Sequence, residues 1–369
     1  MKAFSIDRYG KNSGRLSEVP TPEVGPHDVL IEVHASSVNL LDSKIRQGEF
    51  KLILPYKLPL ILGNDLAGVV VEVGPQVRRF KPGDAVYARP PQTRIGTFAQ
   101  WIAVHQDAVA LKPANIDMAQ AASIPLVALT AWQVLVETAQ LKKGQKVLIH
   151  AGSGGVGTLA IQLAKHLGAF VATTTSTGNV QWVKALGADQ VIDYTQQHFE
   201  DVLHGYDVVL NSLGDDVLKK SLQVLKPGGQ LISISGPPTV QFAQEQGLAW
   251  PLQQVMRLLS FGIRRKARQR DVRYAFVFMR ADGAQLQQIT ALIEAGIIKP
   301  VVDRSFSFES TAEALQYVEQ GRAKGKVVIK LRREGTEVEV LGLNEASATI
   351  VDRFGVHDKD NASDLLSGH

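Results

Sequence analysis

The feature that most constrains the fold is a glycine-rich turn between a short apolar run and an amphipathic segment. Residues 146–149 are Lys-Val-Leu-Ile, and residues 150–157 continue as His-Ala-Gly-Ser-Gly-Gly-Val-Gly. Apolar residues then recur at helical spacing up to a glycine at position 168, which predicts a strand, a tight turn and a helix. The glycines follow the pattern G-x-G-x-x-G, in which a bare backbone lets a pyrophosphate approach the helix N-terminus. The sequence therefore predicts that a dinucleotide contacts Gly152, Ser153, Gly154, Gly155, Val156 and Gly157, with a purely structural glycine turn as the alternative.

The residues after the next strand bear on which dinucleotide binds. Enzymes that use NAD place an Asp or Glu on the ribose 2′-hydroxyl there, but no carboxylate occurs between Gly152 and Ala188. Thr175, Ser176 and Asn179 offer neutral hydrogen-bonding groups instead, which can receive a 2′-phosphate without repelling it. The sequence therefore predicts NADPH (NADP) as the cofactor, and an ordinary polar turn is the alternative interpretation.

Composition sets the broad class of protein. The chain has 369 residues, of which 45% are hydrophobic and 21% are charged, which is ordinary for a folded protein of two domains. It has no cysteine, so disulfides and thiolate metal sites are excluded. The N-terminus has no apolar signal core, and no stretch of about 20 apolar residues occurs. We expect a cytoplasmic protein with no membrane partner.

The formal charge of +4 conceals an uneven distribution. Residues 334–369 carry eight acidic and two basic side chains, and this polar acidic tail, residues 332–369, has no function that its sequence suggests. A basic cluster lies earlier, at Arg257, Arg264, Arg265, Lys266, Arg268, Arg270 and Arg273. Because no aromatic residues are interleaved with it and no nucleic-acid motif is present, we expect no nucleic-acid partner. The cluster is interpreted as a solvated face or as a rim that attracts a phosphorylated cofactor.

Short β-branched runs separated by Gly and Pro turns fill the first 122 residues and predict a barrel-like β module. Strands and helices alternate from about residue 123, which predicts a parallel, doubly wound sheet. The motifs then fall in one order along the chain: residues 35–42, 46–48, 63–68, 81–87, 129–132, the glycine turn, residues 186–189, 192–194 and 325–328. With these motifs the chain resembles the medium-chain dehydrogenase/reductase superfamily, and within it the zinc-independent quinone oxidoreductase-like group.

The resemblance implies an α/β protein in which a GroES-like β-rich catalytic domain is joined to a Rossmann domain. We expect the catalytic domain at residues 1–122 and 265–331 and the NADP-binding domain at residues 123–264, with the active site in the cleft between them. A homodimer formed through an edge of the Rossmann sheet is also implied.

The chain departs from the zinc alcohol dehydrogenases, which hold a catalytic metal with a thiolate and an imidazole. Asn64 stands where that family has its metal-binding histidine, and the four-cysteine structural lobe is absent. None of the nine histidines has ligand spacing. The prediction is a hydride transfer that uses no metal.

The resemblance assigns further roles residue by residue. Asn39, Asp42 and Thr130 would act in catalysis, near the nicotinamide and the substrate, although Asn39 as a helix cap and Asp42 as a first-turn residue is the alternative. Beyond the residues already named, the cofactor would contact Tyr194, Leu213, Gly214, Ser235 and Gly236. Tyr194 at the end of a strand could equally be a packing residue.

The substrate pocket is predicted to include Phe50 and Asn64. Phe50 stands where related quinone and enoyl-thioester reductases often have a tyrosine, and a phenyl ring cannot donate a proton. The prediction is a zinc-independent NADPH-dependent oxidoreductase that transfers hydride to a quinone or a similar conjugated carbonyl. An alkenal or enone (or enoyl-thioester) reductase and an NADPH-binding sensor without turnover are the alternatives.

Overall fold

The computed structural model describes residues 1–332. The predicted acidic tail therefore lies outside the described residues, apart from Arg332. None of the helices in the described part of the chain is long and apolar enough to cross a bilayer.

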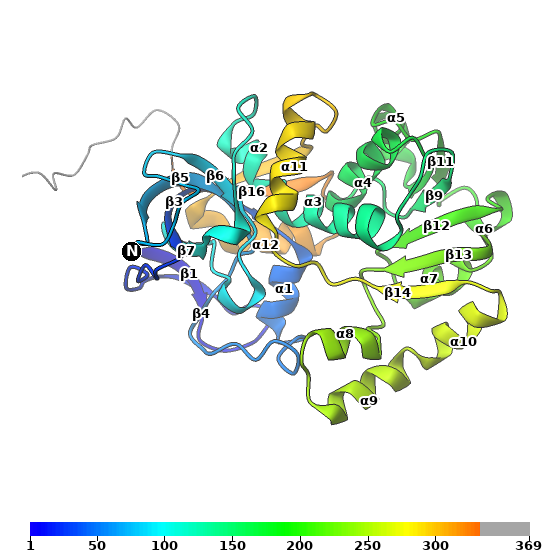
Figure 1. The fold of residues 1–369 in the computed structure, drawn as a ribbon, viewed down its shortest axis with the longest axis horizontal. Helices are drawn as coiled ribbons and strands as arrows, with labels where there is room; N and C mark the ends of the chain where they lie inside the picture. Colours follow the sequence, from blue (N-terminus) through cyan, green and yellow to red (C-terminus); the bar gives the residue numbers. More distant parts are fainter. Residues whose placement is uncertain (333–369) are drawn as a thin grey trace, which may run out of the picture. The chain divides into compact units, whose positions relative to one another are not determined.

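The β-rich part contains two sheets (Figure 1). The larger has the order β15-β16-β3-β5-β6-β8, and β7 pairs with β3 beside this path. Its strands are β3 (Asp28–Val38), β5 (Asp65–Val73), β6 (Ala85–Ala88), β7 (Trp101–His105), β8 (Val109–Leu111), β15 (Val302–Ser307) and β16 (Lys326–Lys330). The smaller sheet joins β1 (Lys2–Ile6), β2 (Arg15–Glu18) and β4 (Leu60–Ile61). Since β16 pairs with β3, the last strand of the described chain completes the sheet that β3 begins.

The second part is a six-stranded parallel sheet in the order β11-β10-β9-β12-β13-β14. Its strands are β9 (Lys146–Ile149), β10 (Phe170–Thr175), β11 (Gln190–Asp193), β12 (Tyr206–Asn211), β13 (Leu225–Ser233) and β14 (Arg273–Phe276). In chain order this is 3-2-1-4-5-6, the arrangement of a Rossmann fold, and it confirms the predicted fold class. The sheet continues beyond residue 264, where we expected the NADP-binding domain to end, because β14 pairs with β13.

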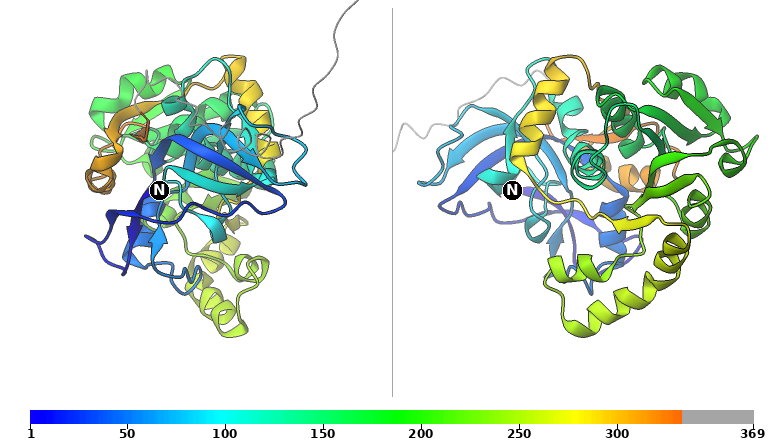
Figure 2. Two further views of the ribbon diagram at one scale, coloured as in Figure 1. Left: turned by 90° about the vertical axis from the view of Figure 1, so that its left-hand side faces the viewer. Right: turned by 45° about the vertical axis from the view of Figure 1, so that its right-hand side comes forward.

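Helices cover both parts of the molecule (Figures 1 and 2). They are α1 (Leu40–Gln47), α2 (Met118–Ala122), α3 (Pro125–Trp132), α4 (Gly155–His166), α5 (Val180–Ala185), α6 (Phe199–Val202), α7 (Asp215–Ser221), α8 (Val240–Glu245), α9 (Trp250–Leu259), α10 (Phe261–Gln269), α11 (Gly283–Glu294) and α12 (Thr311–Glu319). A π-helical turn, Gln133–Thr138, follows α3.

Helix α4 forms where the glycine pattern predicts it. Gly154 is its N-cap, and Leu159, Ala160 and Leu163 are buried at helical spacing toward the core. The helix stops before Gly168, which adopts the left-handed conformation (φ 82°) that favours glycine after a helix end.

One hydrophobic core joins the two parts. It contains Ala35 and Tyr87 from the β-rich sheets together with Val147 and Ile149 of the parallel sheet. The Tyr87 hydroxyl also donates a hydrogen bond of 2.9 Å to the Leu286 carbonyl of α11. This shared core fixes the glycine turn close to the β-rich sheet, which places the candidate site.

Candidate active site

Helix α1 begins the candidate site. The backbone N–H of its N-cap, Asn39, donates to the Asp42 carboxylate at 2.7 Å, so Asp42 does hold the first turn. The amide of Asn39 also contacts two side chains outside the helix. It donates to Asp65 Oδ2 at 2.8 Å and accepts a hydrogen bond from the Lys326 ammonium. Asn39 is thus the N-cap of α1 and Asp42 holds its first turn, as the structural alternative expects. The catalytic roles of the two residues stay predictions.

Asp42 is fully buried, and burial raises its pKa to about 6. Hydrogen bonds from the Asn39 N–H and the Asn64 amide act in the opposite direction, and the nearby Asp65 charge raises the pKa further. Asn64 Nδ2 lies 2.7 Å from Asp42 Oδ1, while Asn64 Oδ1 accepts a 3.2 Å bond from Arg89. Asn64 thus has both ends of its amide occupied and no exposed surface. Asn64 therefore supports Asp42. This contact differs from the prediction that Asn64 lines the substrate pocket.

Asp65 is the centre of this buried cluster. Its carboxylate accepts hydrogen bonds of 2.7 Å from the Ser37 hydroxyl and from the Leu126 N–H. Its Oδ2 lies 3.3 Å from the Lys326 ammonium, and both side chains are almost completely buried. A buried carboxylate needs such compensation. Together with the Asn39 amide, these donors fix the Asp65 side chain between β3, α3 and β16.

Lys326 connects this cluster to the glycine turn. A Cβ placed on Gly155 would lie 2.8 Å from Lys326 Cδ, so the stem of the lysine runs directly over that glycine. The neighbouring Gly325 N–H donates to the Ser153 carbonyl at 2.8 Å. Sequence reasoning placed Lys326 in a motif but gave it no role, since Asn39 and Lys326 are 287 residues apart.

The geometry of the glycine turn fits a dinucleotide. A Cβ on Gly152 would meet Thr173 Oγ1 at 2.2 Å, and one on Gly157 would meet the Ala151 carbonyl at 2.2 Å. On Gly154 the nearest atom would be 3.4 Å away. Two glycines are therefore required by the protein's own packing, while the third leaves open space at the N-terminus of α4, which suits a pyrophosphate.

The predicted adenosine-side residues gather at the carboxyl ends of β10 and β11. Thr175 is buried, and its hydroxyl has no hydrogen-bond partner within residues 1–332. Ser176 accepts a 3.1 Å bond from Asn179 Nδ2. Tyr194 is 62% exposed, so it is not a packing residue. A buried hydroxyl without a partner is costly in a closed core. The predicted contact of Thr175 with the cofactor stays a prediction.

A matching feature lies on the predicted nicotinamide side, at the end of β12. Asn211 is fully buried and donates to the Leu213 carbonyl at 3.0 Å, but its Oδ1 has no partner among the described residues. The Ser235 hydroxyl donates to the same carbonyl at 2.7 Å. Gly214 follows Leu213 in the chain, and Gly236 follows Ser235. Sequence reasoning missed Asn211, although a polar residue that closes a buried strand at this edge is a usable signal.

Thr130 lies inside α3, one helical turn after Leu126. Its hydroxyl donates to the Leu126 carbonyl at 2.7 Å, and the Leu126 N–H donates to Asp65. Thr130 is therefore connected to the buried cluster through the helix backbone. Its predicted action on the nicotinamide ring stays a prediction.

Phe50 belongs to a group of aromatic side chains. Its ring lies 6.0 Å from that of Phe278, and Phe278 lies 5.7 Å from Phe242. Phe242 also contacts Phe276 edge to face at 5.1 Å. These rings form an apolar wall that suits a planar, apolar molecule.

The donor set at the site does not fit a zinc ion. Within residues 1–332 no group of three or more His, Cys, Asp or Glu side chains is arranged to hold a metal. The cationic Lys326 and Arg89 are also directed into the cluster, where they would repel a cation. Zinc prefers thiolate and imidazole ligands in closed tetrahedral sets, which these residues cannot supply.

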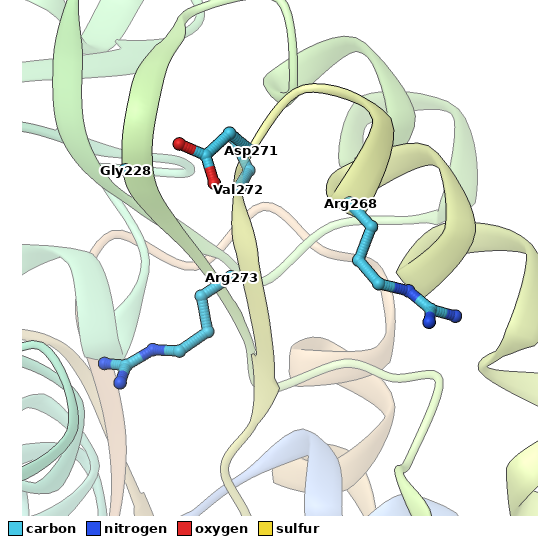
Figure 3. A pocket seen from close by; sticks show the side chains of 5 residues that line it. All are labelled: Gly228, Arg268, Asp271, Val272 and Arg273. Atoms are coloured by element: carbon cyan, nitrogen blue, oxygen red, sulfur yellow. The ribbon is translucent and has the colours of Figure 1, made fainter.

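A separate hollow of about 250 Å³ lies beside the start of β14, away from the glycine turn. It is lined by Gly228, Arg268, Asp271, Val272 and Arg273. Figure 3 shows the guanidinium groups of Arg268 and Arg273 directed away from one another. Since β14 runs parallel to β13, this is the amino edge of the sheet, opposite the carboxyl edge at which ligands of such sheets bind.

Comparison with known proteins agrees with this geometry. Residues 25–114 match the alcohol dehydrogenase GroES-like domain, and residues 186–329 match the zinc-binding dehydrogenase family. The chain is 36% identical to the NAD(P)H oxidoreductase RTN4IP1, mitochondrial, of Danio rerio, over 91% of this chain and 93% of that protein. It is 37% identical to the 2-methylene-furan-3-one reductase of Solanum lycopersicum, over 89% and 79%. The structure of the quinone oxidoreductase from Coxiella burnetii is 32% identical, with a TM-score of 0.79 over 90% of this chain and 99% of that chain.

The fold, the glycine turn and these relatives define an oxidoreductase with a GroES-like and a Rossmann domain. This chain belongs to the medium-chain dehydrogenase/reductase superfamily, in its quinone oxidoreductase-like group. The name of the zebrafish relative places that protein in mitochondria. The cytoplasmic location and the homodimer expected for this chain stay predictions.

Proposed function

We propose that this protein is an NADP(H)-dependent oxidoreductase that delivers hydride to a conjugated carbonyl acceptor, with quinones as the leading class. The observation that carries the proposal is the link made by Lys326. Its stem covers Gly155 of the cofactor turn and its ammonium binds Asn39, the predicted catalytic residue. One side chain thus sets the position of the catalytic cluster relative to the cofactor turn.

The dinucleotide supplies the hydride when it is bound, and the chain's own residues position it. The open backbone at Gly154 and the N-terminus of α4 receive the pyrophosphate. Thr175 Oγ1 and Asn211 Oδ1 offer hydrogen-bonding capacity that the protein leaves unused at the two ends of this edge. Asn39 is held on its far side by Asp65 and Lys326, which fixes the start of α1 before any substrate arrives.

The surroundings favour an acceptor that needs no Lewis acid. An alkoxide product requires a metal or a proton donor nearby, and the residues at this site fit no zinc ion. A quinone or an enone spreads the incoming charge over its own conjugated system. Alignment of two reactants at near-attack distance can lower a barrier by roughly 7–11 kcal/mol, which is sufficient for such activated acceptors. The wall formed by Phe50 and Phe278 suits their planar shape.

An enone or alkenal reductase is the second candidate, because the tomato relative is named for reduction of a methylene group conjugated to a ketone. The same polar cluster and aromatic wall serve either acceptor. An enoyl thioester is the least favoured of these substrates, since Phe50 provides no phenol. A sensor that binds NADPH without turnover would need the glycine turn but neither the polar cluster nor the aromatic wall.

The test is oxidation of NADPH and NADH by the full-length protein in metal-free buffer with chelator. The acceptors are ortho- and para-quinones, an alkenal, an exocyclic enone, an enoyl thioester and an unactivated ketone. We expect turnover with quinones and enones, a preference for NADPH, and none with the unactivated ketone.

The acceptor panel also separates the candidates. Faster turnover of the enones than of the quinones would make the second candidate the function. Tight NADPH binding without turnover of any acceptor would contradict an oxidoreductase of this type and favour the sensor. Loss of activity on chelation would contradict a reaction that uses no metal.

A further inference from the structure

The strongest feature outside the active site is an exposed apolar face on α9 and α10. Figure 1 shows these helices running one after the other along the lower margin of the fold, with α8 next to α9. Five large apolar side chains project from them into solvent, with exposed fractions of 70% for Trp250, 48% for Val255, 76% for Leu258, 60% for Leu259 and 50% for Phe261. Contiguous exposure of this kind in a folded protein marks a surface that something else covers.

The two helices form one amphipathic element. Helical hydrogen bonding passes through Ser260, which donates to the Met256 carbonyl at 3.1 Å and accepts from the Arg264 N–H at 3.0 Å. Met256, Ile263 and Ala267 are buried on the inner side. Leu258, Phe261 and Arg265 follow one another at spacings of three and four residues, which places an arginine on the same outer face as the exposed apolar side chains.

The element is strongly basic. Residues 250–272 contain six basic side chains and one acidic side chain, Asp271. None of the six basic side chains makes an ion pair with a described residue, although Arg264 donates to the Ser260 hydroxyl and to the Arg257 carbonyl. Their charge is therefore available to a partner. A second copy of this face is a poor partner, because the two basic surfaces would repel each other.

We propose that the outer face of α9 and α10 docks on a bilayer that is rich in anionic lipid. A helix with apolar side chains and basic residues on its exposed surface lies in the interface plane of a membrane, where the apolar groups enter the acyl boundary. The basic residues bind the anionic headgroups, and Trp250 is of the type enriched at membrane interfaces. The sequence prediction of no membrane partner depended on the lack of a spanning stretch, which surface docking does not need.

The inner side of the same element leads toward the substrate wall. Met256 packs with Phe242 in one small core, to which Ile53 and Phe278 also contribute. Phe242 contacts Phe278, and Phe278 contacts Phe50. The docking face therefore lies one layer of side chains away from the predicted substrate pocket. A lipid-dissolved acceptor would approach the protein on this side.

The test is flotation of the purified full-length protein with vesicles of phosphatidylcholine alone and of phosphatidylcholine with 30 mol% phosphatidylglycerol. We expect the protein to float with the anionic vesicles and to be released by high salt. Each basic residue near an anionic surface changes partitioning by about fivefold, so R265E/R268E is expected to lower it by at least about tenfold. The variant L258S/L259S is expected to lose flotation as well.

A matched control carries the charge change elsewhere. K142E/K143E alters two exposed lysines outside α9 and α10 and is expected to float like the parent protein. NADPH titration and the melting temperature report whether each variant is folded, and R265E/R268E alone decides the matter if L258S/L259S does not fold. The proposal is overturned if the parent protein does not float, or if R265E/R268E floats as well as the control. A parent protein that does not float but becomes monomeric on L258S/L259S substitution would assign the face to a second copy.

Discussion

The buried cluster around Asp65 and the carboxyl edge of the parallel sheet are both polar, yet they differ in how their polar atoms are satisfied. In the cluster, Asp42, Asp65 and Asn64 each have protein partners for both terminal atoms of the carboxylate or amide. At the sheet edge, Thr175 and Asn211 each keep one buried polar atom without a partner in the described chain. The protein satisfies these three side chains of the first region by itself, whereas Thr175 and Asn211 of the second region each keep an unsatisfied atom.

Because of this difference, we expect the two regions to respond differently to substitution. Polar groups that bind each other stabilise the fold. When one partner is removed, the other stays buried as a charge or dipole that neither the protein nor water compensates. Groups without partners cost stability in the free protein and contribute on binding. We therefore expect substitutions in the cluster to act on unfolding, and substitutions at the sheet edge to act on cofactor affinity.

The largest effect is expected for Lys326→Met, which leaves Asp65 buried without its cation. The removal of one partner from a buried pair costs about 3–5 kcal/mol, measured here as the free energy of unfolding in denaturant. The double variant D65N/K326M removes both charges and is expected to cost much less than the sum of the single variants. Additive costs would mean that the two charges do not interact.

The next effect concerns the pH dependence of stability through Asp42. Its pKa is about 6 in the folded protein against an ordinary value of 3.8, so folding favours the protonated form. The stability that this gives is fully present below about pH 4 and is lost as the pH rises through 6. The difference corresponds to about 3 kcal/mol. Relative to D42N, the unfolding free energy of the parent protein should fall by about this amount between pH 4 and 7. Parallel curves for the two proteins would show that Asp42 ionises normally.

A pair of glycine substitutions tests the cofactor turn itself. A Cβ on Gly157 would lie 2.2 Å from the Ala151 carbonyl, whereas one on Gly154 would meet nothing closer than 3.4 Å. We expect G157A to lose about 1–3 kcal/mol of stability through overpacking. We expect G154A to keep its melting temperature and to bind NADPH at least about tenfold more weakly, equivalent to about 1.4 kcal/mol. If G154A bound NADPH normally, the pyrophosphate would have to lie elsewhere.

The smallest effect is expected for Thr175→Val, which removes the unpartnered buried hydroxyl without a large change of shape. The free protein should become no less stable and gain up to about 1 kcal/mol, while NADPH affinity should fall by a fewfold. Calorimetric unfolding with and without NADPH measures both. A loss of stability in the free protein would show that the hydroxyl already has a partner, and the contrast between the two regions would fail at this residue.

The features of the fold that depend on local sequence patterns can be predicted from the sequence. The glycine turn, the parallel doubly wound sheet and the helix that ends before Gly168 follow from spacing and turn residues, and the structure confirms them. The structure also brings Asn39, Asp42 and Asn64 together, although the contacts that these residues make differ from the expected ones. The sequence does not predict that β14 belongs to the parallel sheet, because an edge strand after a long helical segment has no pattern that identifies its partner strand.

Long-range contacts are what the sequence does not reveal. Lys326 contacts Asn39 and Asp65 only because β16 pairs with β3. No periodicity in the sequence predicts that pairing. The basic cluster in residues 257–273 is visible in the sequence. That Leu258 and Phe261 stay exposed beside it is not, since apolar residues at helical spacing are usually buried.

The lateness of β16 in the chain also matters for synthesis. Asp65 leaves the ribosome long before Lys326, so during translation its carboxylate has no buried cation to pair with, and α1 has no anchor on the glycine turn. The buried cluster around Asp65 can close only when the last strand of the sheet has been made. A ribosome that stops just short of this lysine would release a chain with nearly all of its Rossmann domain but without an assembled active site.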